Sequence, residues 1–138
     1  MIFYKMKKTS LLNQALSEVI ASMGHTDMLV VADSGLPVPK GVRRIDLALT
    51  KNVPGFMETV KVVLEELAVE RAIFALEMRL KSPDLYQQLT SLLKDRDISW
   101  EEIAHEEFKA RTSLAVAVVR TGEFTPYANV ILQAGVVF

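Results

Sequence analysis

Apolar residues recur at the helical spacing of three and four in several stretches of the chain. Over residues 11–23 the repeat places apolar side chains at Leu12, Leu16, Val19, Ile20 and Met23. Ser10 is placed to cap the start of this helix, and Gly24 is placed to end it. The pattern predicts further helices over residues 54–67 and over residues 82–94, where Ser82 is the cap and Pro83 the first helical position, and a short helix from His105.

Short apolar runs between these helices predict a sheet of about six strands. The runs are Met28–Ala32, Arg44–Leu49, Val69–Ala75, Ile98–Ile103, Leu114–Val119 and Tyr127–Gln133. Prolines and glycines exclude regular structure from residues 35–41, and residues 121–126 form a second loop. Strands that alternate with helices are typical of α/β proteins. We therefore expect a three-layer α/β/α sandwich around a mainly parallel sheet, with residues 1–138 forming one domain.

Composition narrows the classes of function. Half of the 138 residues are apolar, and 16 basic against 17 acidic residues give a net charge of -1. This balance argues against a nucleic-acid partner and a polybasic membrane anchor, and no apolar run approaches the roughly 20 residues that span a bilayer. The lack of cysteine excludes disulfides and thiolate chemistry and suits a cytoplasmic protein. Met6 resembles a second start, so residues 1–5 are a candidate N-terminal extension.

Known cofactor motifs are missing from the sequence. No G-x-G-x-x-G or G-x-x-x-x-G-K-[ST] is present, so the expected fold is Rossmann-like without a dinucleotide fingerprint. No G-x-S-x-G elbow or H-E-x-x-H pair indicates a serine hydrolase or a metal centre. We expect no cofactor and no metal, so side chains must carry any chemistry. His25 and His105 are the only histidines, and both lie at element boundaries, where each could equally be an exposed loop residue.

Four segments together resemble the D-ribose pyranase family, whose wider group includes L-fucose mutarotase. They are Gly24–Asp27, Asp33–Pro39 with its continuation Arg44–Leu49, His105–Lys109 and Arg120–Asn129. The match runs in order from Met6 to Phe138, and the Gly-Leu-Pro-x-Pro sequence at residues 35–39 favours ribose over fucose. The resemblance implies a cofactor-independent isomerase that interconverts the β-pyranose and β-furanose forms of D-ribose. It also implies a homo-oligomer, with rings of five subunits that often stack into decamers.

The resemblance further implies roles for individual residues. His25 matches the catalytic acid. The positions that match sugar contacts are Asp33, His105, Tyr127, Ala128 and Asn129. Lys109, one helical turn beyond His105, is a further candidate contact. Opening a pyranose ring takes a proton from the anomeric hydroxyl and gives one to the ring oxygen, and one or two imidazoles can carry both transfers.

The order of the elements suggests how the site is assembled. His25 precedes the first strand and Asp33 follows it, while His105 also follows its strand. Six strand residues span about 20 Å at roughly 3.3 Å each. A ribose cannot touch both ends of one strand, so we expect a site shared between neighbouring subunits, with His25 from one chain and Asp33 and His105 from the next.

Two other functions use the same residues. A non-catalytic ribose-binding or transport-accessory protein would need the pocket but no proton transfer by His25. A mutarotase for another sugar, such as L-fucose, would need the same chemistry in a different pocket. A nucleotide-binding protein without its fingerprint is the weakest alternative.

Overall fold

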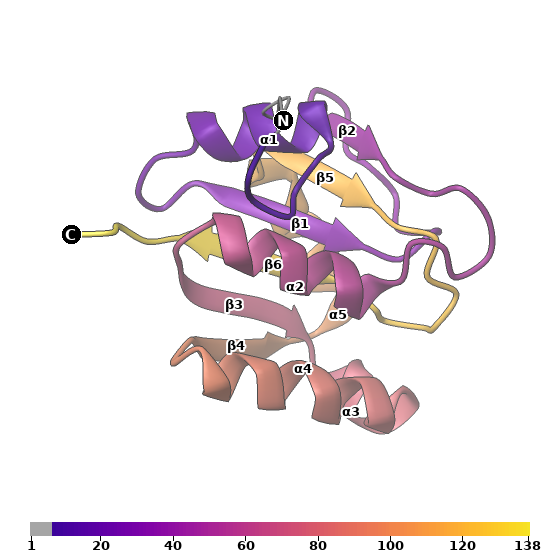
Figure 1. The fold of residues 1–138 in the computed structure, drawn as a ribbon. Helices are drawn as coiled ribbons and strands as arrows, with labels where there is room; N and C mark the ends of the chain where they lie inside the picture. The colour runs from indigo at the N-terminus through magenta and orange to yellow at the C-terminus, as the bar shows by residue number, and fades with distance from the viewer. Residues whose placement is uncertain (1–6) are drawn as a thin grey trace, which may run out of the picture.

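The computed structural model describes residues 7–138, which form one six-stranded sheet with helices on both faces (Figure 1). The helices are α1 (Gln14–Ser22), α2 (Phe56–Glu66), α3 (Glu77–Lys81), α4 (Pro83–Asp95) and α5 (His105–Arg111). The strands are β1 (Met28–Ala32), β2 (Arg43–Asp46), β3 (Val69–Ala75), β4 (Ser99–Ile103), β5 (Ala117–Arg120) and β6 (Val130–Ala134). A short 3-10 helix covers Thr112–Leu114. The predicted extension at residues 1–5 lies outside the described residues.

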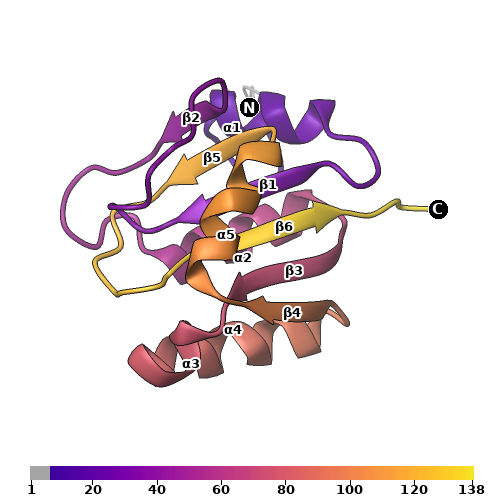
Figure 2. The ribbon, with the colours of Figure 1, turned by 180° about the vertical axis from the view of Figure 1, so that it is seen from behind.

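The sheet has the strand order β2-β5-β1-β6-β3-β4. Neighbouring strands are parallel except at β6, which runs antiparallel to both β1 and β3. This confirms the predicted mainly parallel sheet. Because β6 is reversed, its amino end lies at the sheet edge where β1 and β4 have their carboxyl ends (Figure 2).

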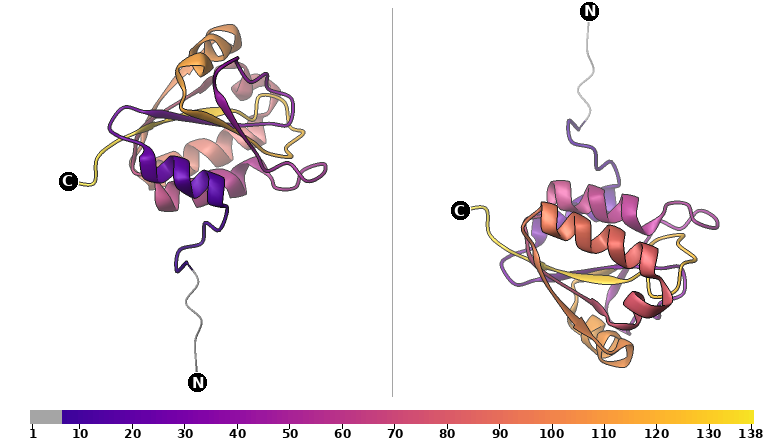
Figure 3. Two further views of the ribbon diagram at one scale, coloured as in Figure 1. Left: turned by 90° about the horizontal axis from the view of Figure 1, so that it is seen from above. Right: turned by 90° about the horizontal axis from the view of Figure 1, so that it is seen from below.

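The two faces of the sheet are covered unequally (Figure 3). Helices α1, α2 and α4 pack on one face over a large core, which includes Leu29 and Val31 of β1. The alternate residues Val30 and Ala32 point to the other face, where the buried Phe108 of α5 covers them. The central strands are thus buried on both sides, which explains their continuous apolar runs. None of the helices within residues 7–138 combines the length and the apolar character needed to cross a bilayer.

Several predicted boundaries were wrong. Helix α1 is capped by Asn13, whose Oδ1 accepts a 2.9 Å hydrogen bond from the Leu16 amide, and the hydroxyl of Ser10 instead contacts Glu65. Leu12 therefore lies before the helix and is 67% exposed. Helix α3 was not predicted, because its five residues are too few for a helical repeat to be visible.

The last two strands begin later than predicted. The 3-10 turn occupies the start of the fifth predicted strand, so β5 begins only at Ala117. The sixth begins at Val130, since Tyr127 has a positive φ of 62° and cannot extend a strand. Residues 127–129 consequently form a loop at the sheet edge.

Candidate functional site

A pocket of about 340 Å³ opens at the sheet edge formed by the carboxyl ends of β1 and β4 and the amino end of β6. It is lined by Asp33, Gly35, Leu36, Pro37, His105, Lys109, Pro126, Tyr127 and Asn129. Five of the seven predicted site residues are therefore brought together here, although they come from three separate parts of the chain. The volume is at the small end of the range of ligand pockets, which suits a monosaccharide.

Asp33 is fixed by its neighbours at the end of β1. Its Oδ1 accepts a 2.9 Å hydrogen bond from the Gly35 amide, and its Oδ2 accepts a 3.2 Å bond from Nδ2 of Asn129. Oδ1 of the buried Asn129 in turn accepts a 2.8 Å bond from the Asp33 amide. Burial raises the pKa of the Asp33 carboxyl, against the opposing effect of these hydrogen bonds. Each carboxylate oxygen keeps a lone pair for a further donor.

His105 begins α5, and its ring is held between two aromatic rings. Phe108 stacks nearly parallel to it, with ring centroids 6.1 Å apart, and Tyr127 meets it edge-on at 5.0 Å. Both carboxylate oxygens of Glu77 accept a 3.1 Å hydrogen bond from the His105 amide. Nδ1 of the ring is buried and has no hydrogen-bond partner within residues 7–138. A buried polar atom without a partner is costly, so this nitrogen is a candidate contact for a sugar hydroxyl if the ring turns toward the pocket.

The loop that carries Tyr127 is supported from below. The hydroxyl of Ser82, at the junction of α3 and α4, donates a 2.6 Å hydrogen bond to the Pro126 carbonyl, and it makes no cap bond to α4. The Asn129 amide donates a 2.9 Å bond to the Tyr127 carbonyl. These contacts hold Tyr127 in its left-handed conformation, which a bulky residue adopts only when its surroundings enforce it.

Lys109 and Ala128, two further predicted contacts, differ in their relation to the pocket. Lys109 lines the pocket and forms a 3.0 Å ion pair with Glu106. The side chain of Ala128 is buried in the core and does not line the pocket, so only its backbone is near the site.

His25 lies at the opposite end of β1 from the pocket. It precedes the strand in the loop whose next residue, Thr26, donates a 2.9 Å hydrogen bond to the Ala134 carbonyl at the far end of β6. Its side chain is 52% exposed, and its Nε2 lies 3.1 Å from Oε2 of Glu70. The chain therefore places His25 and the predicted sugar contacts at opposite ends of the sheet.

Comparison with known proteins identifies the family. Residues 6–137 match the model of the RbsD / FucU transport protein family. The chain belongs to this family. Two members named D-ribose pyranase, from Coprothermobacter proteolyticus and Clostridium perfringens, are 60% and 56% identical, and each match covers 96% of this chain and 100% of the relative. The solved structure of Bacillus subtilis RbsD complexed with D-ribose is 50% identical, with a TM-score of 0.92 over 96% of this chain and 100% of that one.

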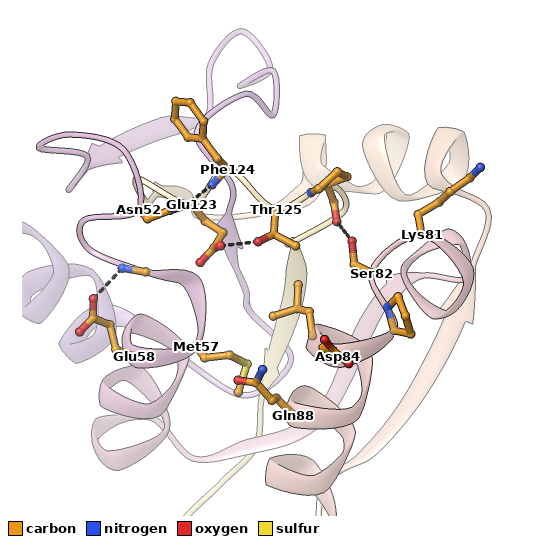
Figure 4. A pocket seen from close by; sticks show the side chains of 14 residues that line it. Asn52, Met57, Glu58, Lys81, Ser82, Asp84, Gln88, Glu123, Phe124 and Thr125 are labelled. Atoms are coloured by element: carbon orange, nitrogen blue, oxygen red, sulfur yellow. Dashed lines mark hydrogen bonds between the residues drawn. The ribbon is translucent and has the colours of Figure 1, made fainter.

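A larger pocket of about 650 Å³ adjoins the first and shares Pro126 with it (Figure 4). None of the residues that match the sugar contacts of the family lines it. Several of its polar groups are engaged in local structure, since Glu123 accepts hydrogen bonds from the Phe56 amide and the Thr125 hydroxyl, and Asn52 accepts one from the Phe124 amide. The residues predicted to contact the sugar gather instead in the smaller pocket.

Two residues that support the site were not predicted from the sequence. They are Glu77 on α3 and Ser82 at the junction of α3 and α4. Ser82 was interpreted as a helix cap because a proline follows it. Glu77 gave no signal, since the helix that carries it was not predicted. Within residues 7–138, no three His, Asp or Glu side chains are grouped to hold a metal ion.

Proposed function

We infer that the protein is an isomerase that interconverts the β-pyranose and β-furanose forms of D-ribose. The observation that carries this inference is the pocket at the sheet edge, where Asp33, His105, Tyr127 and Asn129 gather in a family whose members of over 50% identity are named D-ribose pyranase. The related structure that contains D-ribose supports ribose as the ligand.

The reaction breaks one C–O bond and forms another, and the protein has to supply only proton transfers. The bond between C1 and the ring oxygen O5 breaks as O5 gains a proton and the C1 hydroxyl loses one, which leaves an open-chain aldehyde. Rotation then brings O4 to C1. The furanose closes when O4 adds to C1 and loses its proton, while O1 regains one. Atoms and protons balance, so no external reactant is consumed.

We propose that His25 supplies the proton to the ring oxygen. Asp33 and the imidazole of His105 are the two candidate acceptors for the proton of the anomeric hydroxyl. The edge of Tyr127 closes one side of the pocket, and Lys109 and the backbone near Ala128 add polar contacts. Acid–base catalysis of this kind contributes about 10²–10⁴-fold, which is sufficient for a reaction that also proceeds unaided.

The proposed site is completed by a second copy of the chain. His25 and the pocket lie at opposite ends of β1, so one subunit cannot bring both to one sugar. In a ring, each subunit would present His25 to the pocket of its neighbour, which is a head-to-tail contact. We propose such a homo-oligomer, with five-subunit rings or a stacked decamer as its form and the cytoplasm as its location.

The activity is tested by NMR exchange spectroscopy on equilibrated D-ribose. We expect the protein to accelerate exchange between pyranose and furanose signals, and His25→Ala to abolish the acceleration while ribose still binds. Binding of ribose without acceleration by the wild-type protein would support the transport-accessory function instead. If neither occurs, the same assay with L-fucose tests the mutarotase alternative.

The shared site is tested by mixing two inactive variants, His25→Ala and His105→Ala. In mixed rings about a quarter of the sites combine an intact His25 with an intact His105 from the neighbour, because each of the two positions has an even chance. Activity should return to about that fraction of wild type once subunits have exchanged. Exchange without any recovery would contradict the shared site.

A further inference from the structure

His25 belongs to a line of three hydrogen-bonded side chains at the end of the sheet. Its Nε2 lies 3.1 Å from Oε2 of Glu70 on β3. The other oxygen of this carboxylate, Oε1, accepts a 3.0 Å hydrogen bond from Nε2 of Gln133 on β6. The loop before β1, the start of β3 and the end of β6 meet at this end of the sheet (Figure 1).

The backbone is shaped to present Glu70. Val69 pairs with Ala134 and Arg71 pairs with Gln133, so Glu70 is an extra residue in the ladder between β3 and β6. Such a β-bulge turns a side chain away from its regular direction and is common beside active sites.

Gly135 leaves room for the base of the Glu70 side chain. A Cβ atom at this position would lie 3.2 Å from Cβ of Glu70, which is closer than ordinary contact. Both the bulge in β3 and the glycine that follows β6 therefore serve the placement of one side chain.

The hydrogen bonds determine which nitrogen of His25 is free. The bonds from Gln133 and His25 lower the pKa of the Glu70 carboxyl, so the group is an ionised carboxylate that only accepts hydrogen bonds. The Nε2 atom of His25 must then carry the hydrogen in this pair. Nδ1 is left as the nitrogen that can exchange a proton with another molecule.

We propose that Glu70 is the positioning residue of His25, holding its Nε2–H so that Nδ1 alone exchanges protons with the sugar. The proposal rests on the function proposed above, in which His25 protonates the ring oxygen. In the protonated ring both nitrogens carry hydrogen, and the Nδ1 proton passes to O5 as the bond from C1 to O5 breaks. This leaves the neutral ring with its hydrogen on Nε2, and Nδ1 takes a proton back from O4 as the furanose closes. The Nε2 proton stays in the bond to Glu70 throughout.

The test compares Glu70→Gln with wild type in two measurements. Exchange spectroscopy should show a fall in kcat of roughly 10- to 100-fold with KM nearly unchanged, a smaller loss than for His25→Ala because the imidazole remains. Nitrogen NMR of protein labelled at its two histidines should show one tautomer of His25, with hydrogen on Nε2, in wild type. The spectrum of Glu70→Gln should show a mixture of the two His25 tautomers. The signals of His25 are assigned as those that disappear in His25→Ala.

Two further variants make the test specific. Gln133→Leu removes the second hydrogen bond of Glu70 and should give the same tautomer mixture with a smaller loss of kcat, even if Glu70→Gln folds poorly. Glu18→Gln is the matched control, since it removes an exposed carboxylate that pairs with Arg43 on the surface. This control should leave kcat and the His25 spectrum unchanged.

The outcomes separate this proposal from the one on which it rests. If His25→Ala retains full activity, the role of His25 in the proposed function is wrong. If His25→Ala is inactive but Glu70→Gln and Gln133→Leu keep wild-type kcat and tautomer, the proposed function stands and the role of Glu70 is overturned.

Discussion

At the scale of single residues, the side chain of Asn129 fixes Asp33 through two hydrogen bonds. Its amide group accepts from the Asp33 backbone and donates to the Asp33 carboxylate, and it is almost completely buried. Asn129→Ala leaves a buried backbone amide without a partner and frees the carboxylate to rotate. A lost hydrogen bond to a charged group costs about 1.5–3 kcal/mol, so we expect ribose affinity to fall by roughly 10- to 100-fold in a calorimetric titration.

A matched variant separates this effect from general destabilisation. Thr90→Val removes the hydroxyl that donates a 2.8 Å hydrogen bond to the Tyr86 carbonyl within α4, away from the pocket. It should leave ribose affinity unchanged. An equal loss of affinity in both variants would contradict the role of Asn129.

The raised pKa of Asp33 predicts how ribose binding depends on pH. The ionised carboxylate accepts hydrogen bonds from sugar hydroxyls, and burial makes it protonate at a higher pH than the ordinary value of 3.8. Ribose affinity should therefore weaken on acidification while most surface carboxylates are still ionised. Titrations across the acidic range should show this in wild type and no such decline in Asp33→Asn, which binds weakly throughout. The same decline of ribose affinity in Asp33→Asn would contradict the assignment of this pH dependence to Asp33.

The raised pKa of Asp33 predicts the opposite pH trend for the free energy of unfolding. Because its pKa is higher in the folded than in the unfolded chain, the folded protein holds more protons between 3.8 and the folded value. The contribution of Asp33 to the free energy of unfolding is therefore largest at low pH and decreases as the pH rises through that window. Glu70 and Glu102, whose pKa values are lowered, act in the reverse sense. Urea unfolding should isolate the Asp33 term as the difference between wild type and Asp33→Asn.

At the scale of elements, α5 is placed by a residue of another helix. Glu77 of α3 accepts the His105 amide hydrogen with both carboxylate oxygens and so caps the start of α5. Glu77→Ala should cost about 1 kcal/mol of stability, the typical value for a lost N-cap, and should lower kcat because His105 is the first residue of the helix. Glu77→Gln, which still accepts one hydrogen bond, should retain most of the stability and most of the kcat of wild type.

An exposed glutamate of α5 provides the comparison. Glu107 forms a 2.9 Å surface ion pair with Arg111, four residues along the same helix. Such a pair contributes about 0.3–0.5 kcal/mol, so Glu107→Ala should change thermal unfolding little and leave kcat unaffected. Equal changes in kcat for Glu77→Ala and Glu107→Ala would show that the cap has no special part in placing His105.

The elements also show what the sequence could predict. The buried strands β1 and β3 were found at their observed bounds, because apolar runs between helices leave little choice. The apolar pattern of β6 does not indicate the direction of the strand, since parallel and antiparallel strands in a buried sheet have the same apolar composition. Yet that direction brings Tyr127 and Asn129 to the edge that holds Asp33 and His105.

The supporting contacts could not be predicted for a different reason. Ser82 and Glu77 act on Pro126 and His105, which lie 44 and 28 residues away in the chain. Such pairs depend on the tertiary fold and leave no local pattern. The site residues themselves were predicted through the ordered resemblance of four segments, and the bond between His25 and Glu70 was visible only in the structure.

At the scale of the whole molecule, the two ends of the sheet carry different groups. One end holds the pocket, and the loop between α1 and β1, which carries His25, lies with the C-terminus at the other end (Figure 1). Val136, Val137 and Phe138 are 44%, 89% and 101% exposed, so this apolar tail does not pack in the core of its own subunit. The amide of the preceding Gly135 is bonded to the Ala68 carbonyl, which anchors the base of the tail near Glu70.

This arrangement predicts that the tail contributes to the contact between subunits. Exposed apolar side chains at the end of a chain gain free energy when a second subunit covers them, at about 25 cal/mol per Å² removed from water. A chain that stops after Gly135 should therefore form smaller species than the full chain in analytical ultracentrifugation at the same concentration. It should also lose pyranase activity, because His25 of one subunit no longer reaches the pocket of the next.

The folded subunit itself provides the internal control for this truncation. Residues 136–138 lie outside the core, so the far-ultraviolet circular dichroism of the shortened chain should match that of the full chain. Activity should then return on raising the protein concentration, because association depends on concentration whereas folding of a subunit does not. A truncated chain that keeps its oligomeric state and activity at every concentration would show that the tail is not part of the contact, and the apolar residues would then have to be covered elsewhere.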